Sequence, residues 1–554
     1  MTFETMKTCT SLKTVVFVLL FVWKAKSQLF NNDVQTTSGP VRGTRIFFGG
    51  SAVKQYLGIP FAKPPVGELR FKRPEPVERR RETYIANKMP PACVQYTAYP
   101  FPWYDFQDGK SEDCLYLNMW VPDKLLSGLF SDYSTMFWIY GGGFSVGSNR
   151  KEIYEAQALA AWGNVIVVTI NYRMGAFGFF TSETDEAPGN VGLYDMVEAL
   201  KWVNQNIAEF GGNPEKVTLF GQSAGSISIG FLCVSPLTKG LFHRVIMESG
   251  SPAFLLAENN TVNIAKSQQL AEAVGCADNS TTIYNDPKVV VDCMRDVDAF
   301  VLAKTLNSFN PTSTRSFYPS FGDEILPMNA REAIIKGNFH NVDVLIGNNK
   351  DEGSFQLTTG NPEVFGFFGE KNTRVNKSYG EMLIRDSFSS FSNPDAVVQH
   401  YLGNVADDDY SSIREQVYTS TGDYSLLCPT VYFAESYSEA GNDVYYYFFV
   451  HRPSTTPWAE WMGVAHYEEV QFVFGLPLRK PLNYNLPRET MLSRRMIRIW
   501  TEFAKRGTPG ERNWPQYSQE NPVYVELDTG IRRATGKGPH EDNCDFFRGY
   551  FGFD

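Results

Sequence analysis

Short apolar runs, rich in β-branched and aromatic residues, recur along this chain and are separated by polar or glycine-containing segments. A run that is apolar at every position is typical of a strand covered on both faces, because neither side of such a strand can face water. The clearest runs span residues 135–140, 165–170, 217–220, 344–347 and 444–450. Each of them predicts a buried strand.

Two further stretches carry apolar residues at helical spacing. The first covers residues 196–210, and the run Gly211-Gly-Asn-Pro214 is expected to end it. The second covers residues 492–503, with Gly507 and Pro509 after it. Buried strands that alternate with helices predict an α/β fold, with a large, mostly parallel central sheet and helices on both faces.

The two ends of the chain differ from the rest. Lys7 and Lys13 precede an apolar run at 15–23, and small residues follow up to Ser27. This order predicts a secretory signal peptide over residues 1–27, and the run is too short to span a bilayer. No later segment approaches the roughly 18 consecutive apolar residues that a span requires, so no membrane anchor is evident. The protein is therefore predicted to be secreted and extracellular.

Nothing in the remaining sequence divides it into separate domains. It contains no internal repeat, low-complexity tract or long linker, so residues 28–548 are predicted to form one domain with long insertions, followed by a short tail at 549–554. Hydrophobic residues make up 43% of the chain and charged residues 20%, which excludes wholesale disorder. The net charge of −10, without a basic block, argues against a nucleic-acid partner.

The cysteines fit an oxidising compartment. Of eight, Cys9 leaves with the predicted signal peptide, and six of the remaining seven can form three bridges. Cys233 lies in an apolar stretch and is expected to be a buried free thiol. Three glycosylation sequons, typical of secreted proteins, begin at Asn259, Asn279 and Asn376.

The strongest chemical signal is Gly221-Gln-Ser-Ala-Gly225, which directly follows the predicted strand at 217–220. In this arrangement a sharp strand-to-helix turn exposes the serine hydroxyl, and glycines are needed because larger flanking side chains would collide. Ser223 is therefore the candidate nucleophile. The triplet Gly141-Gly-Gly143 follows another strand and exposes backbone N–H groups, so we assign the oxyanion donors to Gly142, Gly143 and Ala224.

A serine nucleophile needs a base and an acid that orients the base. In the expected order of serine, acid and histidine, four histidines remain, and His466 has the best setting, beside small residues and ahead of an apolar run. The other three are His400, His451 and His540. For the acid, the strand at 344–347 ends in a polar loop in which either Asp351 or Glu352 satisfies the physics.

Several long motifs in this sequence resemble those of one known family. They are Glu68-Leu-Arg-Phe-Lys-Arg-Pro-Glu-Pro76, Ser111-Glu-Asp-Cys-Leu-Tyr-Leu-Asn118, the glycine triplet, Ala187-Pro-Gly-Asn-Val-Gly-Leu193, the Ser223 turn, Asn349-Lys-Asp-Glu-Gly-Ser-Phe355 and the His466 segment through Gly475-Leu-Pro-Leu478. With these motifs in this order, the chain resembles the type-B carboxylesterase and cholinesterase family over nearly its whole length. Tyr140 and the run Trp458-Ala-Glu-Trp461 make it most similar to the cholinesterase branch.

The resemblance implies an α/β-hydrolase fold and selects Glu352 as the acid and His466 as the base. It also implies a structural ion pair between Arg70 and Glu112, and a position for Ser249 close to the triad. No cofactor and no metal are implied. The implied disulfides are Cys93–Cys114, Cys276–Cys293 and Cys428–Cys544. Family members often pair through helices near the C-terminus, which allows a homodimer in which the helix around 489–505 takes part.

The implied substrate is a small carboxylic ester, hydrolysed through an acyl-enzyme. Cholinesterases hold a quaternary ammonium on aromatic faces, and Phe355 and, approximately, Trp103 stand at such positions. Gln222, however, replaces the glutamate that cholinesterases carry before the nucleophile, and it is shared with juvenile hormone esterases. An alternative is therefore a carboxylesterase for uncharged esters. A binding or adhesion protein that uses the same fold without catalysis is a further alternative.

Overall fold

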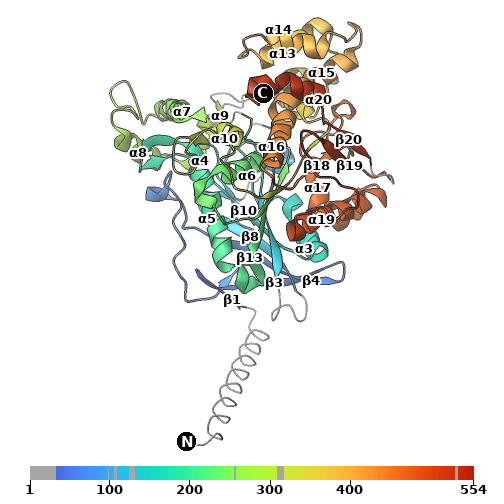
Figure 1. The fold of residues 1–554 in the computed structure, drawn as a ribbon. Coiled ribbons are helices and arrows are strands. Elements are labelled where there is room, and N and C mark those ends of the chain that lie inside the picture. Colours follow the sequence, from blue (N-terminus) through green and yellow to red (C-terminus); the bar gives the residue numbers. More distant parts are fainter. Residues whose placement is uncertain are drawn as a thin grey trace, which may run out of the picture.

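The computed structural model describes residues 33–97, 99–104, 109–123, 132–254, 258–308, 317–530 and 534–553, so the predicted signal peptide at 1–27 lies outside the described residues. Within these residues a sheet of eleven strands crosses the molecule (Figure 1). Its strands lie in the order β20 (Thr535–Lys537), β19 (Val523–Leu527), β18 (Val444–Phe449), β17 (Asp343–Asn349), β14 (Arg244–Glu248), β13 (Gly212–Gln222), β9 (Tyr133–Ile139), β10 (Ile166–Ile170), β8 (Tyr116–Pro122), β4 (Ser51–Pro60) and β3 (Thr44–Phe48). The seven strands from β19 to β10 run parallel to their neighbours, and antiparallel strands extend the sheet at both ends. The predicted large, mostly parallel sheet is confirmed.

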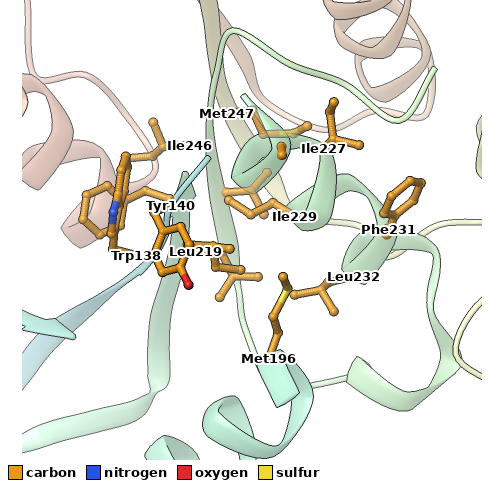
Figure 2. Packing of buried hydrophobic residues seen from close by; sticks show 14 of the residues in the cluster. Trp138, Tyr140, Met196, Leu219, Ile227, Ile229, Phe231, Leu232, Ile246 and Met247 are labelled. Carbon is orange, nitrogen blue, oxygen red and sulfur yellow. The ribbon is translucent and has the colours of Figure 1, made fainter. Parts of the chain in front are cut away.

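All five predicted strands are present, and each belongs to the parallel part of this sheet. Every residue of β9, β10 and β18 is buried, because helices cover both faces. Helices α5 (Val191–Asn206) and α6 (Ala224–Val234) lie on one side, and α3 (Gln157–Gly163) and α19 (Arg488–Arg506) on the other (Figure 1). Figure 2 shows part of the resulting core, with Leu219 and Met247 from the sheet and Ile229 and Leu232 from α6.

The two predicted helices end as their sequences indicate. Helix α5 passes into a 3₁₀ turn at Ile207–Phe210, after which Gly211 adopts a left-handed backbone with φ of 85°. Helix α19 ends in the same way at Gly507, with φ of 76°. Glycine takes this conformation without the steric cost that a Cβ atom adds, so both glycines end their helices.

The C-terminal region is bound into the domain. Helix α20 (Glu541–Phe551) is tied by Cys428–Cys544 to α16 (Cys428–Glu439), and Phe551 is 2% exposed. The boundary predicted at residue 548 therefore falls inside a helix, and the residues predicted as a tail start within it. No helix among the described residues combines the length and apolar character that crossing a bilayer requires.

The remaining covalent and ionic links also follow the resemblance. The pairs Cys93–Cys114 and Cys276–Cys293 are bridged, and Cys233 is buried and unpaired, with burial raising the pKa of its thiol to about 12. Arg70 and Glu112 form the predicted ion pair through two hydrogen bonds of 2.7 and 2.6 Å. Two parallel hydrogen bonds fix the relative orientation of the two side chains, so this pair holds its segments in register.

Candidate active site

Ser223 is the single residue between the end of β13 and the start of α6, with φ of 56° and ψ of −127°. Its N–H donates to the carbonyl of Glu248 at 2.8 Å, which holds the turn against β14. A Cβ atom on Gly221 or Gly225 would lie 2.6 or 2.0 Å from the carbonyl oxygen of Ile139, so both positions require glycine. The strained backbone therefore places the Ser223 side chain, partly exposed, at the N-terminus of α6.

The glycine triplet packs directly against this turn. A Cβ atom on Gly141 would lie 2.8 Å from Cβ of Ser223. Gly142 and Gly143 have positive φ values of 131° and 59°, which turn the chain away from β9. Both line one cavity together with Ser223 and Ala224. The backbone N–H groups assigned as oxyanion donors thus come from two different segments that meet around the serine.

His466 and Glu352 are in direct contact. His466 lies in the loop between a 3₁₀ turn (Glu460–Met462) and α17 (Val470–Val473), and its Nδ1 is 2.6 Å from Oε2 of Glu352. Glu352 is 3% exposed, and its other oxygen accepts the N–H of Asn349 at 2.8 Å. The Glu352 carboxylate is therefore held in position by the backbone as well as by its contact with the imidazole. Donation of the Nδ1 proton to Glu352 leaves Nε2 as an acceptor.

The same loop shows what distinguishes the two candidate acids. Oδ2 of Asp351 accepts the backbone N–H of Val464 at 2.8 Å, and its Oδ1 accepts the hydroxyl of Tyr418 at 3.1 Å. Asp351 therefore holds the backbone of the histidine loop, whereas Glu352 holds the ring. The geometry agrees with the acid that the resemblance selects.

A cavity of about 1480 Å³ joins these groups. Ser223, Gln222 and His466 line it, together with an aromatic wall that comprises Trp103, Phe355 and Trp458. Trp103 lies perpendicular to Trp458 with ring centroids 5.7 Å apart, and Phe355 is 6.1 Å from the His466 ring. All three residues predicted to bind substrate, Trp103, Gln222 and Phe355, thus face the same cavity as the candidate nucleophile.

Comparison with known proteins agrees with this architecture. The sequence profile of the carboxylesterase family matches residues 31–547. The chain belongs to the carboxylesterase family. Among its relatives are acetylcholinesterase-1 of Trittame loki (41% identical, covering 96% of this chain and 97% of the relative), acetylcholinesterase of Leptinotarsa decemlineata (36%, 93% and 85%) and acetylcholinesterase of Bungarus fasciatus (38%, 90% and 82%). The resemblance seen in the motifs is confirmed, and the protein is a cholinesterase-like carboxylic ester hydrolase.

The electrostatics of this carboxylesterase favour protonation of His466. Burial alone lowers the pKa of its imidazole, but the charge and hydrogen bond of Glu352 outweigh burial and raise it. Two more buried carboxyl groups, Glu248 and Glu469, lie nearby. Burial raises the pKa of Glu248 to about 8, and burial together with the charges of Glu248 and Glu352 raises that of Glu469. The charge of Glu469 also raises the pKa of His466, after the larger effects of Glu352.

No motif or spacing in the sequence identifies Glu248 and Glu469 as neighbours of the site. Glu248 is the last residue of β14, and its backbone carbonyl accepts the N–H of Ser223. Glu469 lies three residues after His466. The tertiary fold alone brings both carboxyl groups close enough to interact. Ser249 follows Glu248 with φ of 52°, and its N–H donates to the carbonyl of Gly347. It is fully buried, next to the residue that binds the Ser223 turn.

Gln222 contacts the nitrogen of His466 that faces away from Glu352. Its Nε2 lies 3.0 Å from Nε2 of His466, and Gln222 is 1% exposed. Because Nδ1 carries the ring proton, the amide donates to the lone pair on Nε2. A neutral donor therefore occupies the position at which a carboxylate would add charge to the site.

The other sequence candidates lie elsewhere. None of the other three candidate histidines lines the cavity: His451 binds Glu489 at 2.9 Å, His540 binds Asp423 at 2.6 Å, and His400 contacts Asn543 at 2.9 Å. The three sequon residues Asn259, Asn279 and Asn376 are exposed, as glycosylation requires.

Proposed function

We propose that this carboxylesterase hydrolyses small carboxylic esters through an acyl-enzyme on Ser223, with His466 as base and then acid, and Glu352 as the residue that orients it. The observation that carries the proposal is the 2.6 Å contact of Glu352 with Nδ1 of His466, in a cavity that also contains Ser223. Fixing the proton on Nδ1 leaves a lone pair on Nε2, which Gln222 contacts in this structure and which the serine hydroxyl must reach to transfer its proton.

The steps follow from these positions. Oγ of Ser223 attacks the ester carbonyl while its proton passes to Nε2 of His466, and Gly142, Gly143 and Ala224 donate N–H groups to the oxyanion. The C–O bond to the alcohol then breaks, and the alcohol leaves with the proton from Nε2. Water repeats the sequence on the acyl-enzyme, releasing the acid and restoring Ser223.

Two alcohol portions are candidates. The aromatic wall suits a cation, and the relatives are named acetylcholinesterases, which supports a choline ester. The neutral amide of Gln222 beside His466 supports an ester of an uncharged alcohol instead. We further propose that the protein acts outside the cell, which the predicted signal peptide at 1–27, three disulfides and exposed sequons support.

The proposal is tested with the purified mature protein, a panel of aryl, aliphatic and choline esters, and a phosphonofluoridate label. We expect turnover of at least one ester class, and a single adduct that peptide mass spectrometry assigns to Ser223. No turnover across the panel, together with no adduct, would contradict ester hydrolysis and favour a binding role.

Replacing Gly142 by Ala is expected to lower kcat by about 10²–10³-fold, because an oxyanion donor is displaced. The added Cβ would lie 1.9 Å from the carbonyl oxygen of Val146, and φ of 131° disfavours any side chain. Steady-state kinetics measures the loss. Gly240→Ala is the matched control, since it has a left-handed φ of 78° but open space around its Cβ and lies outside the cavity. An equal loss in both variants would contradict the assignment.

Replacing Gln222 by Glu is expected to move the acidic limb of kcat/KM for a neutral ester to higher pH, by about one unit. A carboxylate about 3 Å from Nε2 stabilises the imidazolium, which raises the pKa of His466, so the basic form is lost at a higher pH. Gln222→Ala removes the amide without adding charge and should move the limb less. A limb that stays in place or moves to lower pH in Gln222→Glu would show that this contact does not control His466.

A further inference from the structure

Lys151 is a buried cation for which the described part of the chain provides no acidic partner. It is 5% exposed, and its ammonium lies 4.1 Å from the ring centroid of Tyr104, 5.2 Å from that of Tyr467 and 5.7 Å from that of Tyr154. Among the described residues no carboxylate oxygen lies within 4.0 Å of it. Burying an unpaired charge is costly, and the negative faces of aromatic rings offset part of that cost. We call these three tyrosines the tyrosine cage.

The nearest acidic side chains in sequence are engaged elsewhere. Glu152 binds Lys480 at 2.6 Å, and Glu155 binds Arg479 at 2.9 Å. The cage is therefore the compensation that the described residues provide for the Lys151 charge.

The tyrosine cage adjoins the catalytic cavity. Tyr104 and Tyr467 line that cavity together with Ser223 and His466. Tyr467 directly follows His466 in the chain, and the Tyr104 ring is 6.4 Å from the ring of Trp103 in the aromatic wall. The ammonium of Lys151 thus lies behind two residues of the surface that would hold the alcohol portion of an ester.

The backbone conformation of Tyr467 is unusual for a tyrosine and is associated with its place in the cage. Its φ of 83° lies in the left-handed region, which is unfavourable for a bulky side chain. The hydroxyl of Tyr467 donates to that of Tyr154 at 2.9 Å, which ties two members of the cage together. The surrounding contacts hold the ring over the ammonium against the preference of its own backbone.

We propose that Lys151 is a specificity-determining residue, whose ammonium fills the tyrosine cage and makes the site prefer esters of uncharged alcohols over esters of choline. The proposal rests on the proposed ester hydrolysis and names its substrate class. The cage faces already hold a cation, so they offer little to a second one. The ammonium also repels a second positive charge bound in the cavity: two unit charges on the order of 10 Å apart, at an effective dielectric constant of about 20, repel each other enough to change kcat/KM roughly tenfold.

The preference also depends on pH. Burial lowers the pKa of Lys151 to about 7, so its positive charge is fully present well below pH 7 and is lost above it. The groups that face it are the phenols of Tyr104, Tyr154 and Tyr467, and burial raises the pKa of each, so they stay neutral across this range. Discrimination against a cationic alcohol is therefore strongest at acidic pH.

The experiment compares acetylthiocholine with the neutral thioester of the same shape, S-(3,3-dimethylbutyl) thioacetate. The wild-type protein is expected to show the higher kcat/KM for the neutral thioester. At pH 6, where Lys151 is charged, the substitution Lys151→Met should raise the ratio of kcat/KM for acetylthiocholine to that for the neutral thioester about tenfold. In Lys151→Arg, which keeps the charge, the ratio should stay near that of the wild type. Protonation of His466 affects both substrates alike, so it cancels in the ratio.

The outcomes separate this inference from the proposed function. If the wild type turns over neither thioester and Ser223 takes no label, ester hydrolysis itself is wrong. If both are turned over but the wild type prefers acetylthiocholine, or Lys151→Met leaves the ratio unchanged, only the role of Lys151 is wrong. Should Lys151→Met fail to fold, the ratio is followed from pH 6 to 8.5 in the wild type, where it should rise with pH, and in Lys151→Arg, whose charge persists and in which it should rise less. A flat ratio would overturn the inference.

Discussion

Replacing Ser223 by Ala is expected to reduce kcat for any ester substrate by about 10⁴–10⁶-fold, the largest effect of any single substitution in this protein. Without Oγ no acyl-enzyme can form, and the oxyanion donors can only assist direct attack by water. Substrate binding should change little, since the aromatic wall remains. Residual turnover is measured on an aryl ester over hours, and the phosphonofluoridate adduct should disappear.

Ser228→Ala is the matched control for this experiment. Ser228 lies on the same helix α6 and is fully buried, but its hydroxyl donates to the carbonyl of Ala224 within the helix and it does not line the cavity. It should keep its activity within a few-fold and remain labelled. Turnover by Ser223→Ala close to that of the wild type would exclude Ser223 as the nucleophile.

Replacing Glu352 by Gln is expected to lower kcat by about 10³–10⁴-fold while the fold is retained. The amide has nearly the shape of the carboxylate, but it cannot stabilise the imidazolium and can favour the wrong tautomer of His466. The pKa of His466 should also fall, because burial lowers it and the opposing charge of Glu352 is gone. The acidic limb of the residual activity should therefore move to lower pH, which a pH profile of kcat/KM measures.

Asp351→Asn tests whether the role of Asp351 in holding the histidine loop is distinct from the role of Glu352 in orienting the His466 ring. Asp351 accepts the N–H of Val464 and the hydroxyl of Tyr418, so its loss should reduce the midpoint of thermal unfolding and lower kcat much less than Glu352→Gln does. If Asp351→Asn gave the larger loss in kcat, with the acidic limb displaced, the two acids would have to exchange roles.

Much of the fold could be predicted because the pattern of apolar residues within a segment restricts which secondary structure can bury them. The runs at 135–140 and 444–450 are apolar at successive positions, which only a strand covered on both faces can satisfy, and β9 and β18 are such strands. Strands β4 and β14 were not predicted. β4 mixes buried with partly exposed positions in the antiparallel part of the sheet, and the short β14 begins at Arg244 and ends at Glu248. Both sequences carry charged or polar residues, so they lack the fully apolar pattern of a buried strand, and their strand structure depends on pairing with neighbouring strands.

The candidate site divides in the same way. Ser223 could be proposed as the nucleophile from its local sequence, because the turn between a strand and a helix requires small residues around the serine. Longer motifs shared with the family selected Glu352, His466 and the disulfides, where local chemistry had left Asp351 and Glu352 equal. The residues that surround this site could be identified only from the three-dimensional structure. Glu248, Glu469 and Lys151 have no distinguishing pattern, because their unusual states arise from burial and from neighbours brought together by distant segments of the chain.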